Sequence, residues 1–115
     1  MDITGTVYRK VKWKNYLLPE NNPRIERFLK TNGNLIYSQI LEDIKDALNH
    51  GIKEILIAPH RNSIHLISVT YDEFDEILDY ALNWFLEFEN YEECAIVRDL
   101  KFKLEDEKTK NKYSK

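Results

Sequence analysis

The sequence contains very little cysteine, glycine and proline. Cys94 is the only cysteine, so the chain can form neither an internal disulfide nor a cysteine-pair zinc site. The three glycines, Gly5, Gly33 and Gly51, stand far apart, which excludes a glycine-rich phosphate loop and a dinucleotide-binding fingerprint. We therefore expect no cofactor and no metal, and a single thiol suits a reducing cytoplasm.

Long apolar runs and a strong excess of one charge are also missing. Nowhere do about 18 apolar residues follow one another, and residues 1–6 are acidic and polar with no apolar run behind them. Neither membrane insertion nor secretion is expected, and the cytoplasm is the predicted location. The formal net charge of −3 gives no global field for nucleic acid or an anionic membrane, so such binding needs a local patch.

The composition is typical of one folded domain. With 115 residues, of which 43% are hydrophobic and 32% charged, the chain lies in the globular range and suffices for one domain. Residues 1–104 are expected to form this domain, and the charged segment 105–115 is expected to fray because it has no apolar period. Frequent Asn, Lys and Ile indicate an AT-rich coding source, such as certain bacteria or their phages.

Three helices are predicted from apolar residues that recur at steps of three and four. They cover about residues 35–49, 71–88 and 91–104. Thr70 and Glu73 form a capping box at the start of the second helix, and Asn90 caps the third. The short connection between these two predicts an antiparallel helical hairpin. A shorter helix is predicted to begin at Pro23 and to stop at residues 32–34, Asn-Gly-Asn.

The β-rich segments lie upstream of this hairpin. Residues 52–69 hold two β-rich runs separated by turn formers at residues 59–62, which predicts a β-hairpin whose register the pattern leaves open. Residues 6–13 alternate in polarity and are a candidate third strand. The fold class is α+β, with a small antiparallel sheet packed on the three helices.

The segment from Tyr91 to Lys101 opens with an aromatic residue and Glu92, has small residues at Cys94 and Ala95, and continues to Arg98 and Asp99. It resembles the second half of the UVR motif, a helical hairpin of UvrB, UvrC and McsA-type proteins. The resemblance reaches from Tyr91 to Leu104, with Cys94-Ala95 where the family has Ala-Ala. It implies protein docking, with Tyr91, Glu92, Arg98 and Asp99 as the partner-binding residues. The structural alternative is that the small residues let two helices pack closely.

Two further segments suggest nucleic-acid chemistry. A basic strand with an aromatic residue can neutralise phosphates and stack on bases, although lysines also guard sheet edges. A histidine beside an arginine in a turn can serve acid-base chemistry in metal-free RNA cleavage, although turns are ordinarily polar. The residues concerned are Lys10, Lys12, Trp13, Lys14, His60 and Arg61.

No recognised catalytic signature occurs, so no catalytic residue is assigned. The function predicted is that of a small intracellular, non-catalytic protein-binding module, such as an adaptor, inhibitor or regulator. The alternative is a nucleic-acid-binding protein or small ribonuclease. A homo-oligomer, in which the acidic face of the 71–88 helix meets the basic strand of a second copy, is a third hypothesis.

Overall fold

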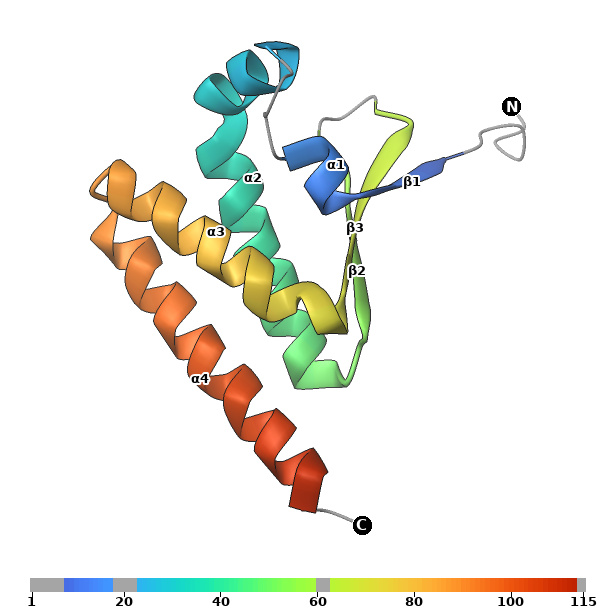
Figure 1. Cartoon of the computed structure of the whole chain (residues 1–115), viewed down its shortest axis with the longest axis vertical. Helices are drawn as coiled ribbons and strands as arrows, with labels where there is room; N and C mark the ends of the chain where they lie inside the picture. Colours follow the sequence, from blue (N-terminus) through green and yellow to red (C-terminus); the bar gives the residue numbers. More distant parts are fainter. Residues whose placement is uncertain (1–7, 18–22, 60–62, 114–115) are drawn as a thin grey trace.

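A computed structural model describes residues 8–17, 23–59 and 63–113. Its elements are β1 (Arg9–Lys12), α1 (Trp13–Leu17), α2 (Pro23–His50), β2 (Glu54–Ile57), β3 (His65–Thr70), a 3₁₀ turn η2 (Tyr71–Glu73), α3 (Phe74–Glu87) and α4 (Tyr91–Tyr113). Figure 1 shows the sheet on one side of the molecule, α2 and α3 beside it, and α4 farthest from it. The predicted α+β class is confirmed.

The described part of the sheet has three strands in the order β1-β3-β2. β2 and β3 are antiparallel, with Leu56 opposite Ser68, so the predicted hairpin is confirmed. β1 runs parallel to β3, with Lys10 opposite Leu66, and the prediction of a purely antiparallel sheet is therefore wrong. Parallel neighbours need a long crossover between them, and the long helix α2 supplies it.

The register of the sheet follows from what its faces contact. Ile55 and Ile57 on β2 are buried together with Ile67 and Val69 on β3, whereas Leu56 is exposed. The four buried side chains share the face that α2 and α3 cover, because alternate residues of a strand point to the same side. A shift by one residue would expose them to water, so helix packing fixes the register that the sequence pattern left open.

The N-terminal strand is shorter than the predicted 6–13, because the described strand ends at Lys12 and Trp13 begins α1. One helical turn brings Trp13 and Leu17 to the same side. Trp13 is 0% exposed, and its ring packs against that of Tyr80 in a T-shaped contact with a centroid distance of 5.3 Å. Burying this large aromatic side chain against α3 explains why the extended chain turns into a helix here.

The helix predicted from Pro23 to the stop at residues 32–34 and the helix predicted at about 35–49 are one continuous helix, α2. A glycine inside a helix costs only about 1 kcal/mol relative to alanine, which is too little to break a helix held by tertiary packing. The amide of Asn32 donates to the carbonyl of Phe28 one turn back, at 3.1 Å. The side chain of Asn34 accepts a hydrogen bond from Nε1 of Trp84 at 2.8 Å, which ties this part of α2 to α3.

Gly33 lies where the Trp84 ring of α3 packs directly against α2. A Cβ atom on Gly33 would lie 2.2 Å from the nearest ring carbon of Trp84. The indole cannot easily move away, because it packs on Tyr37 at 5.5 Å and on Phe88 at 4.8 Å between ring centroids. Gly33, which the sequence pattern predicted to end a helix, is therefore a contact site between two helices.

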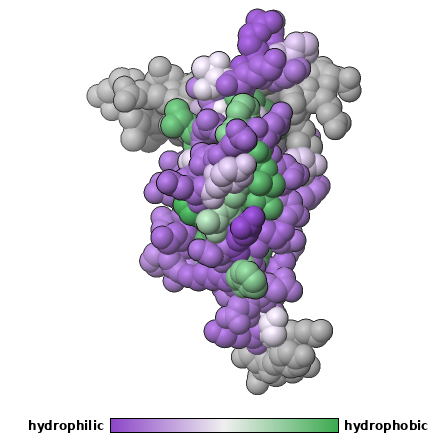
Figure 2. All heavy atoms as spheres, turned by 90° about the vertical axis from the view of Figure 1, so that its left-hand side faces the viewer, coloured by the Kyte–Doolittle hydropathy of each residue, from purple (hydrophilic) through white to green (hydrophobic). Residues whose placement is uncertain are grey.

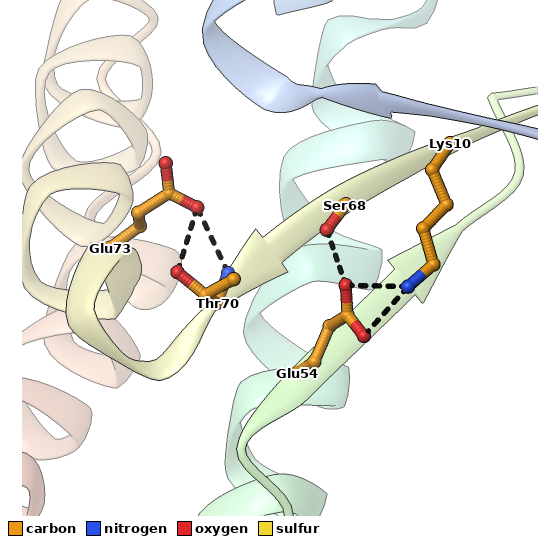
Figure 3. Close-up of polar contacts among 5 residues, drawn as sticks. All are labelled: Lys10, Glu54, Ser68, Thr70 and Glu73. Carbon is orange, nitrogen blue, oxygen red and sulfur yellow. Dashed lines mark hydrogen bonds and ion pairs between the residues drawn. The ribbon is translucent and has the colours of Figure 1, made fainter.

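The predicted start of the 71–88 helix is confirmed, with one difference in its first turn. The Glu73 carboxylate accepts hydrogen bonds from the backbone N–H and the hydroxyl of Thr70, both at 3.0 Å (Figure 3). This first turn is the 3₁₀ turn η2, and α3 follows it to Glu87. Phe88 lies just beyond the helix and is half-exposed, so it does not continue the buried stripe.

α4 begins at Tyr91 as predicted but continues to Tyr113, beyond the predicted end at residue 104. The segment expected to fray is rich in Glu and Lys, which favour helices, and Asp106 pairs with Lys110 one turn later at 3.2 Å. Cys94, Val97, Leu100 and Leu104 form the buried stripe of α4. The residue after Cys94, Ala95, is exposed, so of the two small residues only Cys94 takes part in the helix packing.

Replacement of Gly33 by alanine tests the close contact between α2 and α3. Alanine improves helix propensity by about 1 kcal/mol, but the overlap with Trp84 should outweigh this gain. We expect the Gly33→Ala variant to lose about 1–3 kcal/mol of unfolding free energy, the usual cost of overpacking. Urea unfolding followed by circular dichroism measures the difference.

The matched control places the same substitution in a Trp84→Leu background. There the overlap is gone, and only the propensity gain of about 1 kcal/mol remains, so Gly33→Ala should be neutral or stabilising. An equal loss of stability in both backgrounds would show that the Trp84 contact is not the reason for glycine at position 33.

Candidate functional site

The residues predicted for nucleic-acid binding do not form one surface in the described part of the chain. Lys10 and Lys12 are exposed on β1. Trp13 is fully buried, so its ring faces have no space for a base. Lys14 lies on α1 rather than on the strand. His60 and Arg61 fall outside the described residues.

Lys10 takes part in a polar network on the open face of the sheet. Its ammonium group lies 3.1 Å from Glu54 on β2, and the Ser68 hydroxyl on β3 donates to the same carboxylate at 2.7 Å (Figure 3). The Ser68 hydroxyl and then the Lys10 ammonium hold the pKa of Glu54 below its usual value, because both stabilise the carboxylate. One side chain from each strand thus contributes to a link across the sheet.

The acidic face of α3 is paired within the chain. Lys14 of α1 lies 2.9 Å from Glu76, and this hydrogen bond is the main reason why the pKa of Lys14 is raised. Lys101 of α4 pairs with Asp79 and also lies 3.7 Å from Asp75, and its bond to Asp79 raises its pKa. These carboxylates connect α1 and α4 to α3 in a single copy of the protein.

The four residues predicted to bind a partner are all exposed on α4: Tyr91, Glu92, Arg98 and Asp99. Residues seven positions apart lie on the same side of a helix, about 10 Å apart along its axis. Tyr91 and Arg98 therefore share one strip, which we name the Tyr91 strip. Arg98 borders a shallow depression with Asp75 of α3, whereas Asp99 borders one with Lys45 of α2.

Phe102 extends the Tyr91 strip and was missed by the sequence prediction. It follows Arg98 by four residues and is 78% exposed, and Tyr91 at the other end is 64% exposed. The strip thus reads Tyr91, Ala95, Arg98 and Phe102, at steps of four, three and four. The sequence did contain a signal for it. Phe102 does not fall on the three- and four-residue spacing of the buried residues of α4, so an exposed position could have been predicted.

A groove lies between α2 and α4, and we name it the α2–α4 groove. Its volume is about 640 Å³. Most of the residues that line it belong to α2, and two belong to α4. They are Leu35, Ser38, Gln39, Leu41, Glu42, Asp43, Lys45 and Asp46 of α2 and Glu93 and Ile96 of α4. The Ser38 hydroxyl donates to Glu93 at 3.2 Å, and farther along both helices Lys103 donates to Asn49. These two links show that α2 and α4 run in the same direction beside the groove.

A second groove, of about 470 Å³, lies between α2 and α3. The residues that line it include the aromatic Tyr37, Tyr80, Trp84 and Phe88 and the charged Glu26, Lys30 and Glu87. Burial raises the pKa of Tyr37 to about 12, so its hydroxyl stays neutral. Figure 2 shows hydrophobic side chains in the middle of the face that looks left in Figure 1, surrounded by hydrophilic ones.

The described residues offer few groups for cofactor or redox chemistry. No set of three histidine, cysteine or acidic side chains among them is arranged to hold a metal ion. Cys94 is a free thiol buried in the helix packing, where a thiol acts as a small apolar group. Within the same residues, no helix is both long and apolar enough to cross a membrane. The candidate functional site consists of the two surfaces described above, the Tyr91 strip of α4 and the α2–α4 groove.

The network around Glu54 predicts a loss of stability in acid. Because the pKa of Glu54 is lower in the folded protein, the network stabilises the fold above the unfolded pKa of 4.5. This contribution is lost as the pH falls through the lower folded value. Urea unfolding from about pH 6 to about pH 3 should show a smaller acid-induced loss for Glu54→Gln than for the original protein.

Ser68→Ala is the companion variant, because it keeps the carboxylate and removes the hydroxyl that lowers its pKa most. Its acid-induced loss should lie between those of the original protein and Glu54→Gln. Identical pH profiles for all three proteins would contradict a stabilising role of this network.

We compared the chain with models of protein families, with curated proteins and with solved structures, and none of them matches.

Proposed function

We propose that the protein is a small, non-catalytic protein-binding module that works inside the cell and binds its partner through the Tyr91 strip of α4. The observation that carries this proposal is the exposure of two aromatic side chains, Tyr91 and Phe102, on one side of one helix. Arg98 lies between them on the same side. Aromatic residues and arginine are enriched in the buried centres of protein interfaces, where they supply most of the binding energy.

The spacing of the strip suits a protein partner. From Tyr91 to Phe102 the helix rises by about 16 Å, which is a typical length for one side of a helix-mediated contact. Ala95 between the two aromatic residues is small, so a partner side chain has room beside the α4 backbone. Neither Arg98 nor Asp99 forms an ion pair with a described residue, and both charges are available to a partner.

The resemblance of this segment to the UVR motif supports the same proposal, since that motif docks one protein on another. A nucleic-acid partner has less support. The aromatic residue of the basic segment, Trp13, is buried, and two of its lysines, Lys10 and Lys14, are paired with carboxylates. Pairing of this kind reduces the positive charge that phosphates require.

The double variant Tyr91→Ala/Arg98→Glu tests the proposal. Both side chains are exposed, so unfolding temperature and circular dichroism should hardly change. Affinity capture from cells of the source organism, quantified by mass spectrometry, should recover the specific partner about tenfold less with this variant, as expected when interface hot spots are removed.

The matched control is Tyr8→Ala/Arg9→Glu, which removes the same two kinds of exposed side chain at the start of β1, on the opposite side of the molecule (Figure 1). It should retain every partner. Full recovery of all partners by the Tyr91→Ala/Arg98→Glu variant would refute the proposal, as would an equal loss by the control.

A further inference from the structure

The α2–α4 groove is long enough to lie along three turns of a helix. Its lining residues on α2 extend from Leu35 to Asp46, which is about 16 Å along the helix axis, or three turns. α4 runs in the same direction as α2, as the Ser38–Glu93 and Asn49–Lys103 hydrogen bonds show, and it contributes Glu93 and Ile96 to the groove. Side chains of two parallel helices thus form walls on both sides.

Exposed aliphatic side chains lie on both walls of the groove. Leu35 of α2 is 74% exposed, and Ile96 of α4 is 40% exposed. Covering apolar surface is worth about 25 cal/mol per Å², so a partner that covers both residues gains affinity. Both walls consist of helices, whose backbone groups are already bonded. An extended peptide would therefore find no backbone partners here, whereas a helix brings its own hydrogen bonds.

The charges of the groove indicate which side chains a helix bound in it would carry. Glu42, Asp43 and Asp46 of α2 face the groove together with Glu93 of α4, and Lys45 is the one basic residue among the described lining residues. Neutral groups bond to two of these carboxylates, since Gln39 donates to Asp43 at 2.9 Å and Ser38 donates to Glu93. Burial, and then repulsion from Asp46 and Glu42, raises the pKa of Asp43.

We propose that the α2–α4 groove binds a basic amphipathic helix of the partner protein. The aliphatic side chains of that helix cover Leu35 and Ile96, and its Lys and Arg side chains pair with Glu42, Asp46 and Glu93. This inference rests on the proposed protein-binding function and names the chemistry of the partner. An acidic groove repels phosphates, so the same surface disfavours nucleic acid.

The experiment uses the full chain and a fluorescein-labelled synthetic helix of 18 residues, with Leu at helical spacing and Lys or Arg elsewhere. A second peptide has the same Leu positions and Glu in place of every basic residue. Fluorescence anisotropy should show binding of the basic peptide that weakens several-fold between about 50 mM and 500 mM salt, because salt screens rim charges. The acidic peptide should not bind.

Two variants locate the binding in the groove. Glu42→Lys/Asp46→Lys should weaken binding of the basic peptide at least about tenfold, and Leu35→Ser should weaken it about fivefold. The controls are Asp72→Lys/Glu105→Lys and Leu86→Ser, which make the same changes at exposed positions outside the groove. Both controls should bind within about twofold of the original protein.

Several results would overturn the inference: no binding of the basic peptide, equal binding of the acidic one, or equal weakening by variants and controls. A loss with the charge variant but none with Leu35→Ser would indicate unspecific attraction and would also refute it. The proposed function is tested separately. If the peptide fails while Tyr91→Ala/Arg98→Glu still loses its cellular partner, the groove assignment falls and the protein-binding function stands.

Discussion

The contact between Trp84 and Gly33 is the constraint on which the arrangement of the helices depends. The absence of a side chain at Gly33 lets the indole lie directly against α2, and the bond from Trp84 to Asn34 fixes its orientation. α3 is thereby held against α2, and α4, which folds back on α3, comes to lie beside α2 as well. The α2–α4 groove and the exposed side of α4 are consequences of this packing.

Charges in the protein serve two different purposes. The acidic face of α3 pairs with Lys14 and Lys101, which join α1 and α4 to the centre of the fold. The carboxylates of the α2–α4 groove are instead crowded together and bonded in part to neutral groups. Like charges held close together disfavour one another unless a cation approaches. This difference separates the acidic face that holds the fold together from the acidic groove for which we propose a basic partner helix.

Several elements were predictable because their causes are local. The capping box of Thr70 and Glu73 and the start of α4 at Tyr91 depend on residues within one turn, and both are confirmed. The predictions that proved wrong failed because of contacts with residues far away in the sequence. Trp13 leaves the predicted strand because Tyr80, far along the chain, packs against it. The helix break predicted at Gly33 is wrong because Trp84 occupies the space beside it.

The sequence by itself determined the α+β class, the β-hairpin and the helical periodicities, because hydrophobic spacing and capping act between residues close in the chain. It also identified Tyr91, Glu92, Arg98 and Asp99 as residues of one helix. Only the tertiary structure decided that β1 joins the sheet in parallel, that Trp13 is buried and that Leu35 and Ile96 flank an acidic groove. These features arise from contacts between distant segments, which no local pattern encodes.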